Sequence, residues 1–307
     1  MTTGARRRLT QVDLDMMLDA HERFVAGKPG GRRLSLRFGD LTGLSLAGRN
    51  LPDADFLGTT FDQARLTKAV LDRANLFGAS LQRADLRMAS FKRADLRGVT
   101  FRGADLSLAD LTQADFREGQ VAVPHPTRGL EKMTHERRTG AFDGATLRGA
   151  TLDGSNMTGA SACAADFADC SMTGTKLTGA NLKDANLAGV LMEGADLAGA
   201  NLEGASLAGA VLTGVEIERA RLSRTDLTGA LKDPAPEVKA RAESNLKTAR
   251  GHHEWCVSGG ATGRPARLDG EDLRPLRAAL KGLRLPAVSF KGACLAGLDL
   301  SGCELQG

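Results

Sequence analysis

The stretch ASLQRADLRMASFKRADLRG, residues 79–98, decides the fold of this chain because it repeats every five residues. A large apolar residue occupies every fifth position, and an alanine stands two places before each of them. A helix face recurs about every 3.6 residues and a strand face at every second residue, so neither element explains this spacing. Two inward positions in each unit predict a chain that turns a corner after every unit and stacks into a solenoid.

The repeated unit Ala-(Asp/Asn/Ser/Thr)-(Leu/Phe)-x-x resembles the pentapeptide repeat family, and the resemblance covers most of the chain. It implies an all-β solenoid, the family's right-handed, four-sided parallel β-helix with one pentapeptide on each side. Burial of each large apolar side chain contributes roughly 1.5 to 3 kcal/mol before chain entropy is considered. The residues expected in this core include Leu81, Leu86, Phe91, Leu96, Ala84, Ala94, Leu182, Leu187, Leu197 and Leu202.

The repeat pattern and its interruptions predict six segments. In chain order they are an N-terminal capping helix with its entry loop (1–33), a first repeat run (34–116), a projecting loop (117–141), a second repeat run (142–231), a second capping-type helix with a glycine loop (232–265) and a short third run (266–307). The loop contains no five-residue core pattern, so we expect it to be dispensable for folding.

Two short helices are expected, at about residues 10–26 and 235–257. In the first, Thr10 to Asp13 is typical of a capping box, and the apolar residues Val12, Met16, Ala20 and Phe24 recur at helical spacing. We expect this apolar face to cover the first coil and its strand edges.

An internal duplication is also predicted. Residues 21–41 match residues 253–273 when they are aligned without a gap. This alignment pairs His21 with His253 and Gly31 with Gly263, so the helix end, the glycine loop and the solenoid entry occur twice.

The composition favours a thin solenoid interior and gives little support for catalysis. Aromatic residues make up only 4% of the chain, tyrosine is absent, and there are 37 glycines. No nucleophile motif, phosphate loop or dinucleotide fingerprint is present, so we expect no enzyme activity and no cofactor. His252, His253 and Cys256 lie close together, but a metal site needs three or four converging ligands, and we expect none.

The location expected from the sequence is the cytoplasm. The five cysteines are odd in number and lack the spacing of a disulfide framework. No secretory signal follows the N-terminal arginines, and no apolar stretch is long enough to span a membrane.

The expected function is a non-enzymatic scaffold that meets a protein partner through the sides of the solenoid and the 117–141 loop. The candidate contact residues are Arg117, His125, Arg128, His135, Arg137 and Arg138. The resemblance implies one alternative, because some pentapeptide repeat proteins mimic DNA and bind type II topoisomerases such as gyrase, which protects these enzymes from quinolone drugs. The acidic second run fits that alternative, whereas the net charge of +4 does not.

Nucleic acid is not an expected partner, because Asp72, Asp85 and Asp95 interleave with the arginines of the first run. A second copy of the chain is an expected partner. The sequence shows no helix to cover the last coil, which contains Phe290, Leu295, Leu300 and Leu305. Exposed strand edges and apolar ends favour association, so we expect an end-to-end homodimer through the C-terminal coil.

Overall fold

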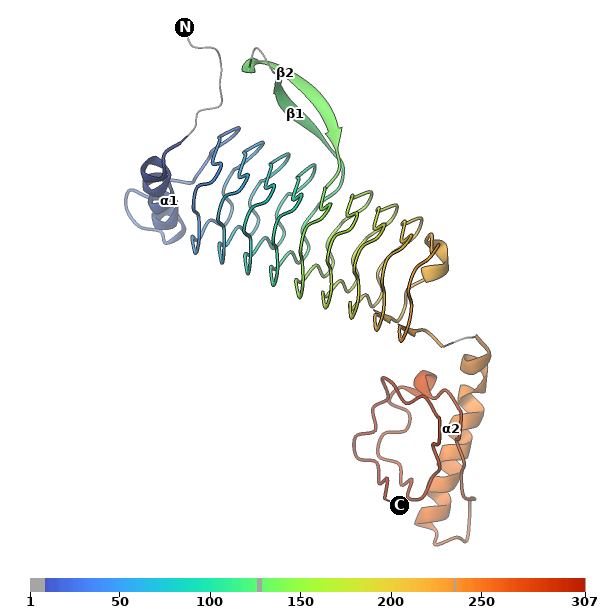
Figure 1. Cartoon of the computed structure of the whole chain (residues 1–307). Coiled ribbons are helices and arrows are strands. Elements are labelled where there is room, and N and C mark those ends of the chain that lie inside the picture. Colours follow the sequence, from blue (N-terminus) through green and yellow to red (C-terminus); the bar gives the residue numbers. More distant parts are fainter. Residues whose placement is uncertain (1–8, 126–128, 235, 307) are drawn as a thin grey trace. The chain divides into compact units, whose positions relative to one another are not determined.

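The computed structural model describes residues 9–125, 129–234 and 236–306. The chain divides into two compact units, Met1–Lys232 (unit 1) and Asp233–Gly307 (unit 2). Unit 1 contains a regular column of coils with helix α1 at its first coil and a β-hairpin on its side (Figure 1). Unit 2 contains helix α2 and a shorter stack of coils.

The column of unit 1 is held together by parallel β-bridges between residues 20 positions apart, such as Asp85 with Asp105. Each coil therefore contains four five-residue units, and each unit ends in a turn. In the last coil the bridges lengthen into two short parallel strands, β3 (Val211–Leu212) and β4 (Leu231–Lys232). A 3-10 turn, η1 (Ile217–Arg219), precedes the final repeats of this unit.

The polar position of each unit is explained by a local hydrogen bond. The side-chain oxygen of Asp110 accepts the backbone N–H of Thr112, two residues later, at 3.1 Å, and Asn201 accepts that of Glu203 in the same way. Aspartate and asparagine form such turns readily, which explains their frequency at this position. The fifth residue of each unit then takes a positive φ, as Gly189 does at 68°, so glycine is favoured there.

The interior of the column is filled by the two inward side chains of each unit. All ten residues expected in the core are buried, namely Leu81, Leu86, Phe91, Leu96, Ala84, Ala94, Leu182, Leu187, Leu197 and Leu202. Cys170 occupies a small inward position, and burial raises the pKa of its thiol to about 12. This thiol is therefore held in its neutral form.

The core runs without a break past the point where residues 117–140 leave the column. Thr100 pairs directly with Ala141, so the strand ladder resumes after the insertion. The Phe142 ring stacks on Phe101 with centroids 5.2 Å apart and meets Phe116 edge-on at 5.0 Å. These aromatic contacts join the two repeat runs into one column.

Helix α1 (Gln11–Val25) begins at the expected capping box on Thr10, but it buries a different face from the one we expected. Leu14, Leu18 and His21 are buried against the first coil. Val12 is 70% exposed and Met16 61% exposed. The expectation that the Val12 and Met16 stripe covers the coil is therefore wrong.

The reason for this orientation is the open strand edge of the first coil, whose backbone groups need polar partners. The side chain of Gln11 accepts the N–H of Ser45 at 2.8 Å, and Glu22 accepts the N–H of Asn50 at 2.9 Å. The His21 ring accepts the N–H of Leu34 at 2.9 Å. These three polar residues flank Leu14 and Leu18 on the helix. When this face turns inward, it provides hydrogen-bond acceptors for the N–H groups of the first coil and buries both leucines at the same time.

In unit 2, helix α2 (Pro236–Val257) packs on the third repeat run. Its buried residues are Asn245, Ala249 and His252. The coils pair in parallel through bridges such as Arg284 with Glu304, and a 3-10 turn, η2 (Arg274–Leu276), lies within the run. The apolar core of this unit contains Ala249, Leu268, Leu273, Leu276, Leu280 and Leu285.

The two units repeat one arrangement of helix and coil, with a correction to the expected alignment. His252, and not His253, takes the place of His21, because its ring accepts the N–H of Ala266 as His21 accepts that of Leu34. His21 lies 13 residues before Leu34 and His252 lies 14 residues before Ala266, so α2 has one more residue between the histidine and the end of the helix. An alignment without a gap therefore matches the solenoid entries correctly and shifts the two helices by one residue.

Candidate functional site

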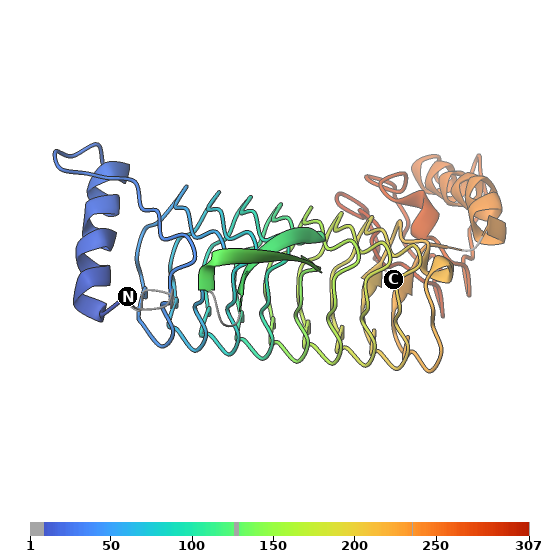
Figure 2. The ribbon, with the colours of Figure 1, turned by 90° about the horizontal axis from the view of Figure 1, so that it is seen from above.

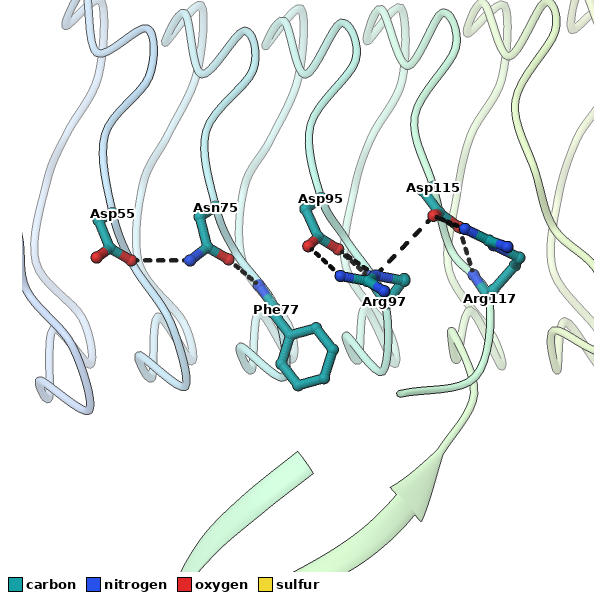
Figure 3. Close-up of polar contacts among 7 residues, drawn as sticks. All are labelled: Asp55, Asn75, Phe77, Asp95, Arg97, Asp115 and Arg117. Atoms are coloured by element: carbon teal, nitrogen blue, oxygen red, sulfur yellow. Dashed lines mark hydrogen bonds and ion pairs between the residues drawn. The ribbon is translucent and has the colours of Figure 1, made fainter. Parts of the chain in front are cut away.

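One side of the unit 1 column carries two groups of polar contacts in successive coils, and we call this side the ladder face (Figure 3). Its first rows are Asp55, Asn75, Asp95 and Asp115, each one coil after the previous one. The Asn75 amide donates to Asp55 at 3.0 Å. Arg97 then lies between the two remaining carboxylates, 2.8 Å from Asp95 and 3.9 Å from Asp115.

The ladder face ends at Arg117, whose guanidinium lies 2.8 Å from the Asp115 carboxylate. Burial alone would raise the pKa of Asp115, but the hydrogen bonds and charge of Arg117 hold it below its ordinary value. The hydrogen bonds that Arg97 donates to the Asp95 carboxylate correspondingly raise the pKa of Arg97. The Arg97 guanidinium also lies 5.2 Å from the centre of the Phe77 ring, a cation–π contact. The charges of this face are therefore balanced from one coil to the next.

The same pairing occurs elsewhere on the first run. Arg87 lies between Asp85 at 2.7 Å and Asp105 at 3.8 Å, and Lys92 lies 2.9 Å from Asp110. These basic side chains are about half exposed, so solvent screens the pairs and they contribute little to stability. Their main effect is on the surface potential, which alternates in sign over short distances.

The segment expected as a projecting loop is an antiparallel hairpin of strands β1 (Gly119–His125) and β2 (Gly129–Arg138). Figures 1 and 2 show it leaving the column and turning back over the earlier coils. A β-strand signal was present in the alternating residues of Gly119–His125, Gly-Gln-Val-Ala-Val-Pro-His, but the five-residue criterion does not detect it.

The base of the hairpin is seated on the column. Val121 is 3% exposed and packs over Gly78 and Gly98, where an added Cβ would lie 2.5 Å and 2.6 Å from the valine methyl groups. Gly119 lies against the Phe77 ring, which a Cβ at that glycine would approach to 2.8 Å. Two stacked glycines thus provide the space that one hairpin side chain fills.

The structure places most of the expected contact residues near this base. Arg117 belongs to the ladder face and pairs with Asp115. His135 and Arg137 are exposed on β2, with Arg137 83% exposed and 3.7 Å from Glu118. Arg138 pairs with Glu136 at 2.7 Å. His125 ends β1, and Arg128 lies outside the described residues.

A second surface feature, which the sequence did not predict, is a groove of about 660 Å³ beside α1. We call it the α1 groove. Its lining residues are Leu9, Asp13, Met16, Met17, Ala20, Arg32, Arg33, Leu34, Ser35, Leu36, Arg37, Phe38 and Gly39. It escaped prediction because we assigned Met16 and Ala20 to the face buried on the coil.

Across the described part of the chain, no three His, Cys, Asp or Glu side chains converge as metal ligands. The two adjacent histidines are engaged in hydrogen bonds, with His252 bonded to Ala266 and Pro286 and His253 bonded to the N–H of Arg284. No helix among the described residues has the length and apolar character needed to cross a bilayer.

Comparison with known proteins agrees with the repeat architecture. The sequence model of the family described as pentapeptide repeats matches residues 40–78, 79–117, 142–179, 155–194 and 191–229, which together make up more than half of the chain. The chain belongs to the pentapeptide repeat family. No protein with a curated description matches it.

Solved structures of other pentapeptide repeat proteins resemble this one. HetL, a protein involved in heterocyst differentiation regulation in the cyanobacterium Nostoc sp. strain PCC 7120, is 28% identical over 68% of this chain and 93% of its own, with a TM-score of 0.29. Rfr23 from the cyanobacterium Cyanothece 51142 is 28% identical over 42% of this chain and 87% of its own, with a TM-score of 0.27. QnrB1, a plasmid-mediated fluoroquinolone resistance protein, is 16% identical over 69% of this chain and 96% of its own, with a TM-score of 0.41.

Proposed function

We propose that this pentapeptide repeat protein is a non-enzymatic scaffold, built on a right-handed, four-sided β-helix, that binds a protein partner through the ladder face and the β1–β2 hairpin. The observation that carries the proposal is the seat of Val121 on Gly78 and Gly98. A hairpin anchored at its base presents its exposed side chains in a constant position relative to the column. Such preorganisation reduces the loss of conformational entropy when a partner binds.

The charges of this surface suit recognition by a protein. Arg137 and His135 are exposed beside the ladder face, whose carboxylates and guanidinium groups alternate. Complementary charge patterns between two proteins mainly increase the specificity and the rate of association, and they increase the affinity less. We therefore expect a partner whose own surface carries charges of both signs, with acidic groups opposite Arg137.

The gyrase-binding alternative calls for a surface of unpaired negative charge that imitates the phosphates of DNA. On the ladder face Asp95 and Asp115 are each paired with an arginine, and Asp85 and Asp110 are paired elsewhere on the first run. This pairing argues against a polyanion surface on the first run. Inhibition of gyrase supercoiling by the purified protein would reverse that preference.

Affinity capture from cells with three forms of the full-length chain tests the scaffold proposal. Arg137→Glu reverses a charge on the hairpin, and Arg148→Glu makes the same change on the second run, away from the hairpin. We expect a partner that is retained by the wild type and the Arg148 variant and lost from the Arg137 variant. Equal retention by all three forms, or turnover of a substrate by the purified protein, would contradict the proposal.

A further inference from the structure

Helix α1 carries a second apolar stripe that the fold does not use. Val12, Met16, Ala20 and Phe24 follow one another at four-residue spacing on the side away from the buried leucines. Val12, Met16 and Phe24 are each about half exposed or more. Regularly spaced apolar residues on the exposed side of a helix are unusual for a surface that meets only water.

Helix α2 provides an internal control for the meaning of this stripe. The buried residues Leu14, Leu18 and His21 of α1 correspond one by one to Asn245, Ala249 and His252 of α2. At the positions that correspond to Val12, Met16 and Ala20, helix α2 has Glu243, Lys247 and Gly251, and only the fourth position keeps an aromatic residue, with Trp255 in place of Phe24. A helix therefore packs on a coil of this type without apolar residues at the first three positions of the stripe, so capping does not explain Val12, Met16 and Ala20 of α1.

The rest of the α1 groove differs from unit 2 in the same way. Phe38 and the three arginines Arg32, Arg33 and Arg37 line it, together with Met16 and Ala20. In unit 2 the corresponding positions carry Gly270 in place of Phe38, Pro265 in place of Arg33 and Asp269 in place of Arg37, and only Arg264 keeps the charge. The apolar floor and a rim of three arginines thus occur together in unit 1, whereas unit 2 lacks Phe38 and keeps only one of the three arginines.

The charge of the groove is not cancelled by α1 itself. The carboxylates of Asp15, Asp19 and Glu22 lie on another side of the helix, where Arg49 pairs with all three. Asp13 lines the groove but takes part in the capping box with Thr10. Arg37 pairs with Asp55. Arg33 donates from Nε to the backbone carbonyl of Asp53 at 2.7 Å, but neither Arg32 nor Arg33 forms an ion pair with a carboxylate of the described residues.

We propose that the α1 groove binds an acidic amphipathic segment of a partner protein. An amphipathic helix places apolar side chains at intervals of three and four residues into such a groove. Here those side chains would contact Met16, Ala20 and Phe38, and carboxylates on the flanks of the segment would pair with Arg32 and Arg33. Residues 1–8 of this chain, MTTGARRR, carry the same positive sign of charge as the groove rim, so they lack the acidic character that the rim favours.

Fluorescence anisotropy with three labelled model peptides of about four helical turns tests this proposal. The first peptide has leucines on one face and glutamates on the other, the second replaces the glutamates with lysines, and the third replaces the leucines with serines. We expect the full-length protein to bind the first peptide about tenfold more tightly than either of the others.

Two variants and two matched controls locate the binding site. Met16→Lys introduces the residue that α2 has at this position, and Arg32→Glu reverses the rim charge. The controls are Val257→Lys, at an equally exposed apolar residue of α2, and Arg264→Glu, at the equivalent arginine of unit 2. We expect each groove variant to weaken binding of the acidic peptide by about tenfold and both controls to bind as the wild type does.

Circular dichroism checks that all four variants are folded. Absence of binding by the wild type, equal binding of the acidic and basic peptides, or groove variants that bind like the wild type would each overturn the proposal. Light scattering tests whether the groove instead binds a second copy of the chain. A wild-type dimer that Met16→Lys converts to a monomer would assign the groove to self-association and would also overturn the proposal.

Discussion

The rings of His21 and His252 make the same two backbone hydrogen bonds in the two units of the chain. In each ring Nδ1 accepts an N–H from the start of the solenoid, that of Leu34 or Ala266. Because Nδ1 is occupied as an acceptor, Nε2 carries the proton and donates it to a proline carbonyl, that of Pro52 at 3.0 Å or Pro286 at 2.9 Å. The duplicated element is therefore a helix together with the coil that it covers.

The geometry of His21 predicts that acid weakens unit 1. Burial lowers the pKa of His21 below its ordinary value of 6.5, although the Pro52 carbonyl, Asp53 and Glu22 partly oppose this shift and Arg33 adds to it. A histidine with a lowered pKa binds fewer protons in the folded state than in the unfolded state, so stability rises with pH. We expect the contribution of His21 to the free energy of unfolding to be fully present above pH 6.5. This contribution decreases as the pH falls below 6.5, because the unfolded chain then binds a proton that the folded chain does not.

Urea unfolding between about pH 5 and pH 7.5 measures this effect. His21→Ala leaves the Leu34 N–H and the Pro52 carbonyl without partners, so it costs about 2 kcal/mol or more at neutral pH and makes the dependence on pH shallower. His135→Ala, at an exposed histidine of β2, is the control and is expected to follow the wild type. A His21 variant with the same pH profile as the wild type would show that this ring is not the titrating group.

The inward and outward positions of one repeat can be compared directly at Leu96 and Arg97. Leu96 is fully buried, so Leu96→Asp places an unpaired charge in the core and is expected to cost more than about 4 kcal/mol. Arg97→Asp removes a half-exposed ion pair with Asp95 and is expected to cost about 1 kcal/mol. Thermal unfolding distinguishes the two effects, and equal losses at the two positions would contradict the assignment of Leu96 to the core.

The repeats could be predicted from sequence because each side chain's direction depends on its place within a five-residue unit. Leu96 points inward for the same local reason as Leu182, so the period alone assigns both to the core. The orientation of α1 could not be predicted in this way, since both of its faces are apolar. The choice between them depends on N–H groups far along the chain, such as those of Ser45 and Asn50.

The candidate site shows the same limit. The sequence identified the exposed Arg137 and His135 by their position in an interruption of the repeats. It did not reveal the seat of the hairpin, because the fit of Val121 onto Gly78 and Gly98 depends on two glycines from successive coils. A positive φ is enough to explain a glycine in the fifth position of a repeat. The sequence therefore gives no sign that Gly78 and Gly98 also form the surface that Val121 contacts.

That seat makes the hairpin a part of the folded column, and a substitution at its centre tests this. Val121→Asp places a carboxylate against Gly78 and Gly98, and we expect it to cost about 2 kcal/mol. Arg137→Asp, at an exposed position of the same hairpin, is expected to leave the melting temperature nearly unchanged. If both variants melt like the wild type, the hairpin is dispensable for stability, as the sequence alone suggested.

The last prediction concerns self-association through the final coil of unit 2. Phe290, Leu295 and Leu300 are only partly buried there, and Leu305 is 47% exposed. Two identical surfaces of this kind can cover each other in a closed two-fold contact, which would also pair their strand edges. We expect light scattering to give a dimer mass for the wild type and a monomer mass for Leu305→Glu. Leu108→Glu, at an exposed leucine of unit 1, is the control and should remain dimeric. A monomeric wild type, or a dimer that persists in Leu305→Glu, would show that this coil is not the interface.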